Sequence, residues 1–171
     1  NRTGTVKLVG NLIKEEEGLS APTLEAAWRL SNTSPSSPDF DKTLKAYIKA
    51  LKADRSLSED ISMLIVVGQL EQAQSQGLSQ DSRVIDLATR HATTILGRSG
   101  FGAAYIDAVL RLKDLLGAQS KDKDQIGAVL EQLLQAAKDD KAVSTKKGLI
   151  EQIESLNENM FGGRKVTSRT I

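Results

Sequence analysis

The residues best suited to chemistry lie in the loop Gly97-Arg98-Ser99-Gly100-Phe101-Gly102, which separates two expected helices. Backbone N–H groups at a helix start can bind an anion with help from the helix dipole, and Arg98 adds a positive charge. The loop lacks the Gly-Lys-Ser/Thr of a Walker A loop, and no expected strand precedes it, as the dinucleotide fingerprint requires. We therefore interpret it as a helix stop followed by a turn, and keep phosphate contact by Arg98 and Ser99 as the alternative.

Nucleic acid is the main alternative ligand for this region. Residues 97–100 match the short glycine-x-x-glycine loop that clamps a nucleic-acid backbone in KH domains, but such domains also need strands, and the pattern predicts none. The C-terminal region is the most basic part of the chain. Phosphate contacts there and in the loop would come from Arg98, Ser99, Lys146 and Lys147.

The sequence gives little support for catalysis by a histidine. His91 is the one histidine and lies seven residues after Val84, which places both on the same helix face. We expect it at the edge of the core with one ring nitrogen hydrogen-bonded. Ser99 and Asp86 are near it in sequence, but no nucleophile-elbow pattern surrounds Ser99. The sequence therefore predicts no catalytic residue and no enzyme.

Metal sites are also not expected. The chain has no cysteine, which excludes thiolate zinc sites, disulfides and a cysteine nucleophile. Residues 121–127 briefly resemble a calcium loop, with Asp122 first and Asp124 third, but Ile126 and Leu133 stand where oxygen ligands are needed. We interpret this segment as a capped helix start and predict no metal and no cofactor.

The bulk composition excludes several classes of protein. Lys plus Arg is 23 and Asp plus Glu is 22, so a net charge of +1 gives no global attraction to nucleic acid or anionic membrane. Aromatic residues are only 4%, too few for a base-stacking platform. The longest apolar run, Met63 to Val67, is far below the roughly 20 residues of a membrane span. The missing cysteines favour the cytoplasm without excluding secretion.

Evenly spaced helix signals predict the fold class. Every second start from Pro38 onward is separated by about 41 to 44 residues, close to the period of two-helix repeat arrays. No clear residue-level repeat is visible beneath that spacing. We expect an all-α protein of six or seven antiparallel helices, as a helical bundle or a short HEAT-like α-superhelix. Helix starts are expected near Pro22, Pro38, Glu59, Gln80, Gly102, Lys123 and Thr145.

The expected organisation is an N-terminal arm (1–20), a helical domain (21–162) and a basic C-terminal tail (163–171). Within the arm, Thr5 to Val9 alternates weakly like a strand. The segment Ile61 to Leu70 is apolar nearly all round, so we expect its helix at the centre of the core.

These features favour a protein–protein interaction or assembly module without catalytic activity. Its partner would be another protein, bound through a helical groove or a terminal segment. The alternative is a nucleic-acid-binding helical domain that uses the Gly97–Gly102 loop and the basic C-terminus. Binding that weakens steeply with salt would support the alternative. The candidate partner-binding residues are Trp28, Arg98, Phe101, Arg164, Lys165 and Arg169.

Overall fold

The computed structural model describes residues 2–13, 18–118, 121–146 and 148–161 of the 171-residue chain. All regular elements in these ranges are helical, which confirms the all-α prediction. The α-helices are α1 Arg2–Gly10, α2 Ala21–Ser31, α3 Phe40–Ala53, α4 Ile61–Ser75, α5 Ser82–Arg98, α6 Ala103–Gly117, α7 Lys123–Asp139, α8 Lys141–Ser144 and α9 Leu149–Phe161. Two 3₁₀ turns, η1 Asn11–Ile13 and η2 Arg55–Leu57, follow α1 and α3.

Side-chain caps fix most of the helix starts. Ser20 caps α2 by accepting from the Thr23 N–H, and Pro22 occupies the first turn, where its missing N–H costs nothing. Asp122 caps α7 by accepting from the Gln125 N–H at 3.1 Å, which confirms the capped start predicted there.

At three other helix starts an aspartate next to the helix takes the N-cap position ahead of a nearby serine, a residue type that also caps helices well. Asp60, not Ser58, caps α4, and the Ser58 hydroxyl donates instead to the Arg55 carbonyl. Asp81, not Ser79, caps α5. Asp39, not Ser37, occupies the N-cap position of α3.

The helix expected from Thr145 is also interrupted. The short helix α8 ends at Ser144, just before Thr145, and α9 begins only at Leu149. The residue before α9 is Gly148, which has a φ of +94°. Glycine accepts this left-handed conformation without the penalty that a Cβ would bring.

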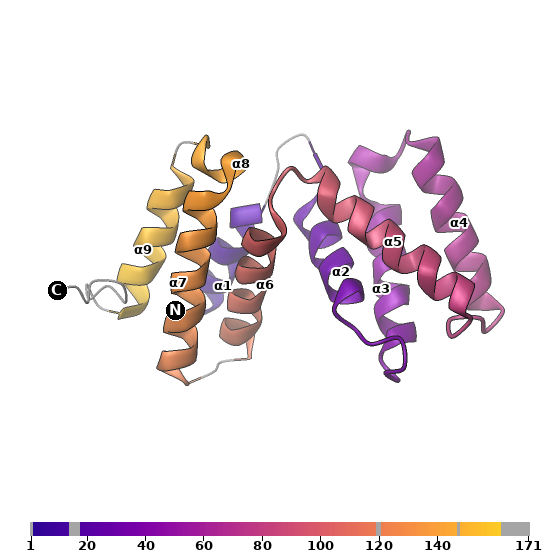
Figure 1. Cartoon of the computed structure of the whole chain (residues 1–171), viewed down its shortest axis with the longest axis horizontal. Coiled ribbons are helices and arrows are strands. Elements are labelled where there is room, and N and C mark those ends of the chain that lie inside the picture. Colours follow the sequence, from indigo (N-terminus) through magenta and orange to yellow (C-terminus); the bar gives the residue numbers. More distant parts are fainter. Residues whose placement is uncertain (1, 14–17, 119–120, 147, 162–171) are drawn as a thin grey trace. The chain divides into compact units, whose positions relative to one another are not determined.

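The helices form two compact units, 14–99 and 1–13 with 100–171. In the first unit α2 packs against α3 and α5, and α4 packs against both α3 and α5 (Figure 1). In the second unit α6 packs against α1 and α7, and α7 packs against α8 and α9.

The N-terminal segment belongs to the core of its unit. Residues 2–10 are helical where a weak strand pattern had been noted, and Val9, Leu12 and Ile13 are buried. The Tyr105 hydroxyl of α6 donates to the Leu12 carbonyl at 2.8 Å. Residues 2–13 therefore contribute buried apolar side chains to this unit.

A residue-level repeat relates the two units, at about twice the spacing detected in the sequence. Residues 18–31 correspond to 100–113 with a shift of 82 positions, and residues 40–75 correspond to 126–161 with a shift of 86. In the first block, Arg29 pairs with Glu25 and Arg111 with Asp107, both at 2.8 Å. In the second block, the clearest sequence match is Asp-Arg-Ser-Leu-Ser (54–58) with Asp-Lys-Ala-Val-Ser (140–144).

The buried positions follow the same correspondence. In α2 and α6 the matched pairs are Leu24 with Ile106, Ala27 with Val109 and Leu30 with Leu112, and all six side chains are buried. In α3 and α7 the matched buried pairs are Phe40 with Ile126, Leu44 with Leu130, Tyr47 with Leu133 and Leu51 with Ala137.

An aspartate has the same structural role in both units. Asp54 accepts from the Ser20 N–H at 3.0 Å and from the Ser56 N–H at 2.9 Å, and so joins the starts of α2 and η2. Asp140 accepts from the Gly102 N–H at 2.6 Å and from the Ala142 N–H at 2.9 Å, and so joins the starts of α6 and α8. Burial raises the pKa of Asp54, but hydrogen bonds from Thr23, Ser56 and Ser20 outweigh it and leave the pKa lowered.

The helices that precede the two copies of the repeat, α1 and α5, pack in opposite units. The helix that precedes α2 in the chain is α1, and it packs against α6. The helix that precedes α6 is α5, and it packs against α2. Each unit is therefore completed by a helix that the chain attaches to the other repeat.

Candidate protein-interaction surface

Helix α4 carries an apolar face that the protein leaves open. Ile61, Leu64 and Ile65 are 72%, 42% and 56% exposed. They lie at i, i+3 and i+4, and the exposed Gly68 continues the same face at i+7. We call these four residues the α4 stripe. Scattered exposed apolar residues are normal, whereas a contiguous set on one helix face is typical of an interaction site.

This arrangement overturns the expectation that α4 lies at the centre of the core. Only one face of α4, with Met63, Val67 and Leu70, is buried. Helix α4 packs against α3 and α5, which cover that face alone. A helix that is apolar nearly all round shows no preferred face in its sequence, so the packing of its neighbours decides which side chains reach the surface.

The internal repeat supplies a reference for the exposed face. Helix α9 corresponds to α4, and its buried Ile153 and Leu156 match Val67 and Leu70. At the positions of Ile65 and Gly68, however, α9 carries Glu151 and Glu154. Leu64 matches the half-buried Ile150, so the two units differ at the positions of Ile65 and Gly68, which are charged in α9 and uncharged in α4.

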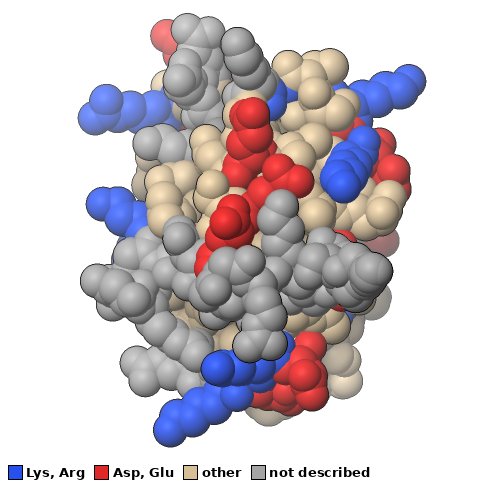
Figure 2. Space-filling view, turned by 90° about the vertical axis from the view of Figure 1, so that its left-hand side faces the viewer, with Lys and Arg blue, Asp and Glu red and all other residues tan. Residues whose placement is uncertain are grey.

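Acidic side chains form a row on the face of the molecule viewed from the side of α9 (Figure 2). Glu151, Glu154 and Glu158 lie at i, i+3 and i+7 of this helix. This is the pattern of a solvated helix surface. The apolar character of the α4 stripe is thus a property of its own sequence and is not required by the fold of the repeat.

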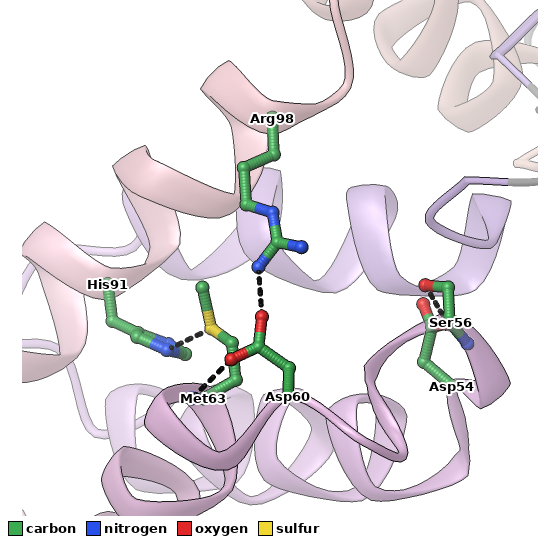
Figure 3. A network of polar contacts seen from close by, with 6 residues as sticks. All are labelled: Asp54, Ser56, Asp60, Met63, His91 and Arg98. Carbon is green, nitrogen blue, oxygen red and sulfur yellow. Dashed lines mark hydrogen bonds and ion pairs between the residues drawn. The ribbon is translucent and has the colours of Figure 1, made fainter.

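Polar contacts hold the start of α4 against α5. The Asp60 carboxylate accepts from the Met63 N–H at 3.1 Å and pairs with the Arg98 guanidinium at 2.9 Å (Figure 3). The Met63 N–H and the Arg98 side chain lower the pKa of Asp60. A charged cap at the α4 start is thereby tied to the end of α5.

His91 of α5 supports the same region from inside. Its Nδ1 lies 2.7 Å from the Tyr47 hydroxyl and its Nε2 lies 2.8 Å from the Met63 sulfur. Burial first, and then the charge of Arg98, lower the pKa of His91 below 6.5, while Asp60 opposes this. His91 is buried, and both of its ring nitrogens have contacts, one more than the sequence predicted.

The far end of α4 is held to α3. Lys52 pairs with Glu71 at 2.7 Å, and the Gln74 amide donates to the Asp41 carbonyl at 3.0 Å. Ser79, just beyond α4, donates to the Asp41 carboxylate. Hydrogen bonds from Ser79 and Gln74 lower the pKa of Asp41. With both ends anchored, the α4 stripe is held in place before any partner binds, which reduces the entropy cost of binding.

The predicted site residues do not gather at this stripe. Arg98 contacts the start of α4 through its ion pair with Asp60, and the buried Ser99 hydroxyl donates to the Leu96 carbonyl at 2.7 Å. Trp28 is half-buried on α2, with the Arg29 guanidinium 5.8 Å from its ring centroid. Lys147, Arg164, Lys165 and Arg169 lie outside the described residues.

Phe101 and Lys146 form a separate contact. Phe101 is buried, its ring centroid lies 5.3 Å from that of Tyr105, and the Lys146 ammonium lies 4.6 Å from the ring centroid of Phe101. Burial followed by the charge of Asp140 raises the pKa of Tyr105. The contact joins the loop before α6 to the segment after α8, so its evident role is structural.

Sequence reasoning missed the α4 stripe because it assigned those residues to the core. The signal was available in the repeat, since aligning α4 with α9 sets Ile65 and Gly68 against glutamates. The described residues contain no group of three or more acidic or histidine side chains that could hold a metal ion. None of the described helices has the length and hydrophobicity that a bilayer span requires.

Comparison with known proteins gives no match: no protein family, no curated protein and no solved structure matches this chain. The functional argument therefore depends on the surface itself.

Proposed function

We propose that this protein is a non-catalytic protein–protein interaction module, built on antiparallel helices, that binds another protein through the α4 stripe. The observation that carries this proposal is the exposure of Ile61, Leu64 and Ile65 on one anchored helix face. Burial of such side chains is worth roughly 1.5–3 kcal/mol each when complete, and folding of this chain leaves much of that unrealised. A partner that covers the stripe would gain this free energy of burial on binding.

The nucleic-acid alternative receives less support. Arg98 is engaged by Asp60 and Lys146 lies over the Phe101 ring, so both side chains already interact with the protein itself. Phosphate contact would have to compete with these interactions.

The test is a quantitative affinity capture with three forms of the full chain: the native protein, Ile65→Glu and Thr93→Glu. Glu is compatible with the fold at position 65, because Glu151 occupies the matching position of α9. Thr93 is exposed on α5, so Thr93→Glu adds the same charge on a helix that does not carry the stripe. Lysate from the source organism would be applied with and without nuclease, and bound proteins would be quantified by mass spectrometry.

We expect a set of proteins that the native chain and Thr93→Glu retain, that Ile65→Glu loses by about tenfold or more, and that nuclease leaves unchanged. A bound set that is identical for all three forms would contradict the proposal. Partners that disappear only with nuclease would favour the nucleic-acid alternative instead. Far-ultraviolet circular dichroism of the three forms would confirm equal folding.

A further inference from the structure

A row of lysines runs along α3 beside the α4 stripe. Lys42, Lys45, Lys49 and Lys52 lie at i, i+3, i+7 and i+10, and all four are exposed. We call them the lysine ridge. Lys52 pairs with Glu71 of α4, whereas Lys42, Lys45 and Lys49 make no ion pair with any described residue. The charge of Asp41 acts on Lys45 from one turn earlier on α3, but none of the three lysines is held in an ion pair within the part of the unit that is described.

The lysine ridge borders the apolar face along one side. Glu71 lies seven residues after Leu64, so both project from the same side of α4. The pair of Glu71 with Lys52 shows that this side faces α3. A segment lying on the α4 stripe therefore meets apolar side chains along its centre and ammonium groups along the edge that faces α3.

The repeat again shows that this charge pattern is specific to one unit. The positions of α7 that match the lysine ridge carry Ala128, Glu131, Gln135 and Lys138. The unit with a charged α9 face thus lacks the ridge, and the unit with the apolar α4 face has it. The two features occur together in the same unit.

We infer that the occupant of the α4 stripe is an amphipathic helix of a partner protein, with acidic residues along one edge of its apolar face. This inference rests on the proposed function and adds the chemistry of the partner. Apolar residues at helical spacing would cover Ile61, Leu64 and Ile65, as in helix-in-groove recognition. Carboxylates along the edge would pair with Lys42, Lys45 and Lys49, and this complementarity would select the partner and fix its orientation.

A second copy of this chain matches the charges alone. Glu151, Glu154 and Glu158 of α9 have the same i, i+3, i+7 spacing as Lys42, Lys45 and Lys49. Ile153 and Leu156 of α9 are already buried within its own unit, and Leu149 and Ile150 of the same helix are half-buried. The apolar side chains described on α9 are thus wholly or partly engaged by its own unit, and a separate helix fits both features better.

The test is a selection from a display library of 18-residue amphipathic helices, in which the apolar face is varied among aliphatic residues and both edges are randomised. The target is the full-length chain. Selected peptides would be titrated against the native protein, the ridge variant Lys45→Glu/Lys49→Glu, the stripe variant Ile65→Glu and the control Lys138→Glu/Lys141→Glu. The control reverses the same number of exposed lysines in the other unit.

We expect enrichment of Asp and Glu on one edge only, and a loss of affinity of tenfold or more in both the ridge and the stripe variants. The control should bind as the native chain does, and binding should weaken steeply with salt. Selection on the ridge variant should abolish the acidic preference or convert it to a basic one.

Other results overturn the inference and separate it from the proposed function. One such result is a set of selected peptides that carry no acidic preference on either edge, bind Ile65→Glu weakly and bind the ridge variant as tightly as the native chain. That result would refute the acidic partner but not the proposed interaction module. Peptides indifferent to Ile65→Glu would refute both. Binding to phosphatidylserine vesicles that needs Ile65 and Lys45, without any selected peptide, would assign the surface to a membrane. Self-association in sedimentation equilibrium that needs both Lys45 and Glu154 would assign it to a second copy.

Discussion

His91 is a titrating group in the interior of its unit and the one histidine of the chain. Tyr47 and Met63 contact its two nitrogens, and burial keeps the folded-state pKa below 6.5. The neutral ring is therefore the form that fits between α3 and α4. The unfolded chain has no such constraint and takes up a proton near pH 6.5.

Stability should consequently fall as pH decreases below about 6.5. The unfolded state then binds more protons than the folded state, and the loss approaches about 1.4 kcal/mol per pH unit until the folded-state pKa is reached. Trp28 is the only tryptophan and lies in the same unit, so its fluorescence during urea denaturation would report this unit between pH 7.5 and 5.5.

The variant His91→Gln supplies the comparison. It should be less stable than the native chain but should lose most of the pH dependence in this interval. Asp41, Asp54 and Asp60 have lowered pKa values in the folded state. Their contribution to stability is therefore lost only at more acidic pH, below the interval from pH 7.5 to 5.5. An unchanged pH slope in His91→Gln would show that the histidine is not the group responsible.

At the scale of the element, α4 is held at both ends by polar contacts but carries exposed apolar residues on its outer face. Gly68 lies in the middle of this helix, and a Cβ built there would meet nothing within 4 Å. Glycine in a helix interior costs roughly 1 kcal/mol relative to alanine, so the internal packing of the unit gives no reason for it. Close approach of a partner helix to the α4 backbone would give one.

We expect Gly68→Ala to raise the free energy of unfolding of this unit by about 0.5–1 kcal/mol, since the added methyl group meets only solvent. Urea denaturation followed by Trp28 fluorescence would measure it. The same variant should bind the selected helical peptides more weakly, because the methyl group stands on the α4 stripe.

Gly77→Ala provides the opposite control. Gly77 has a φ of +75°, and alanine is strained there although the space is open, so this variant should be destabilised by about 1 kcal/mol. A loss of stability in Gly68→Ala comparable to that in Gly77→Ala would show that glycine is needed at position 68 for folding.

At the scale of the whole molecule, the two units differ in how the chain builds them. Residues 14–99 contain all four helices of the first unit in one continuous stretch. The second unit needs α1 from the beginning of the chain in addition to 100–171. Val9, Leu12 and Ile13 contribute buried apolar surface to that unit, so its C-terminal part alone lacks a portion of its core.

A fragment of residues 14–99 should therefore fold cooperatively by itself, as judged by circular dichroism and dispersed amide resonances. A fragment of residues 100–171 should be far less ordered, and addition of a peptide of residues 1–13 should restore helicity in a saturable manner. The variant peptide Leu12→Asp/Ile13→Asp should fail to do so. Full order in 100–171 without the peptide would contradict the structural role of α1.

The sequence by itself determined that the protein is helical and where most of its helices lie. Apolar periodicity, first-turn residues such as Pro22, Asp122 and terminal glycines act within a few residues of the chain, because helix hydrogen bonds and caps are local. The partners of those helices are not local. The sequence around α1 does not indicate that this helix packs against α6, and the packing of α5 against α2 likewise became visible only in the tertiary structure.

The tertiary structure alone decided which apolar side chains became surface. Helix α4 is apolar on nearly every side, so its own sequence permits either a central or an outer position. Packing by α3 and α5 covers Met63, Val67 and Leu70 and leaves Ile61, Leu64 and Ile65 exposed. Local sequence fixes a helix because its bonds are local, whereas burial depends on neighbours that lie far away along the chain.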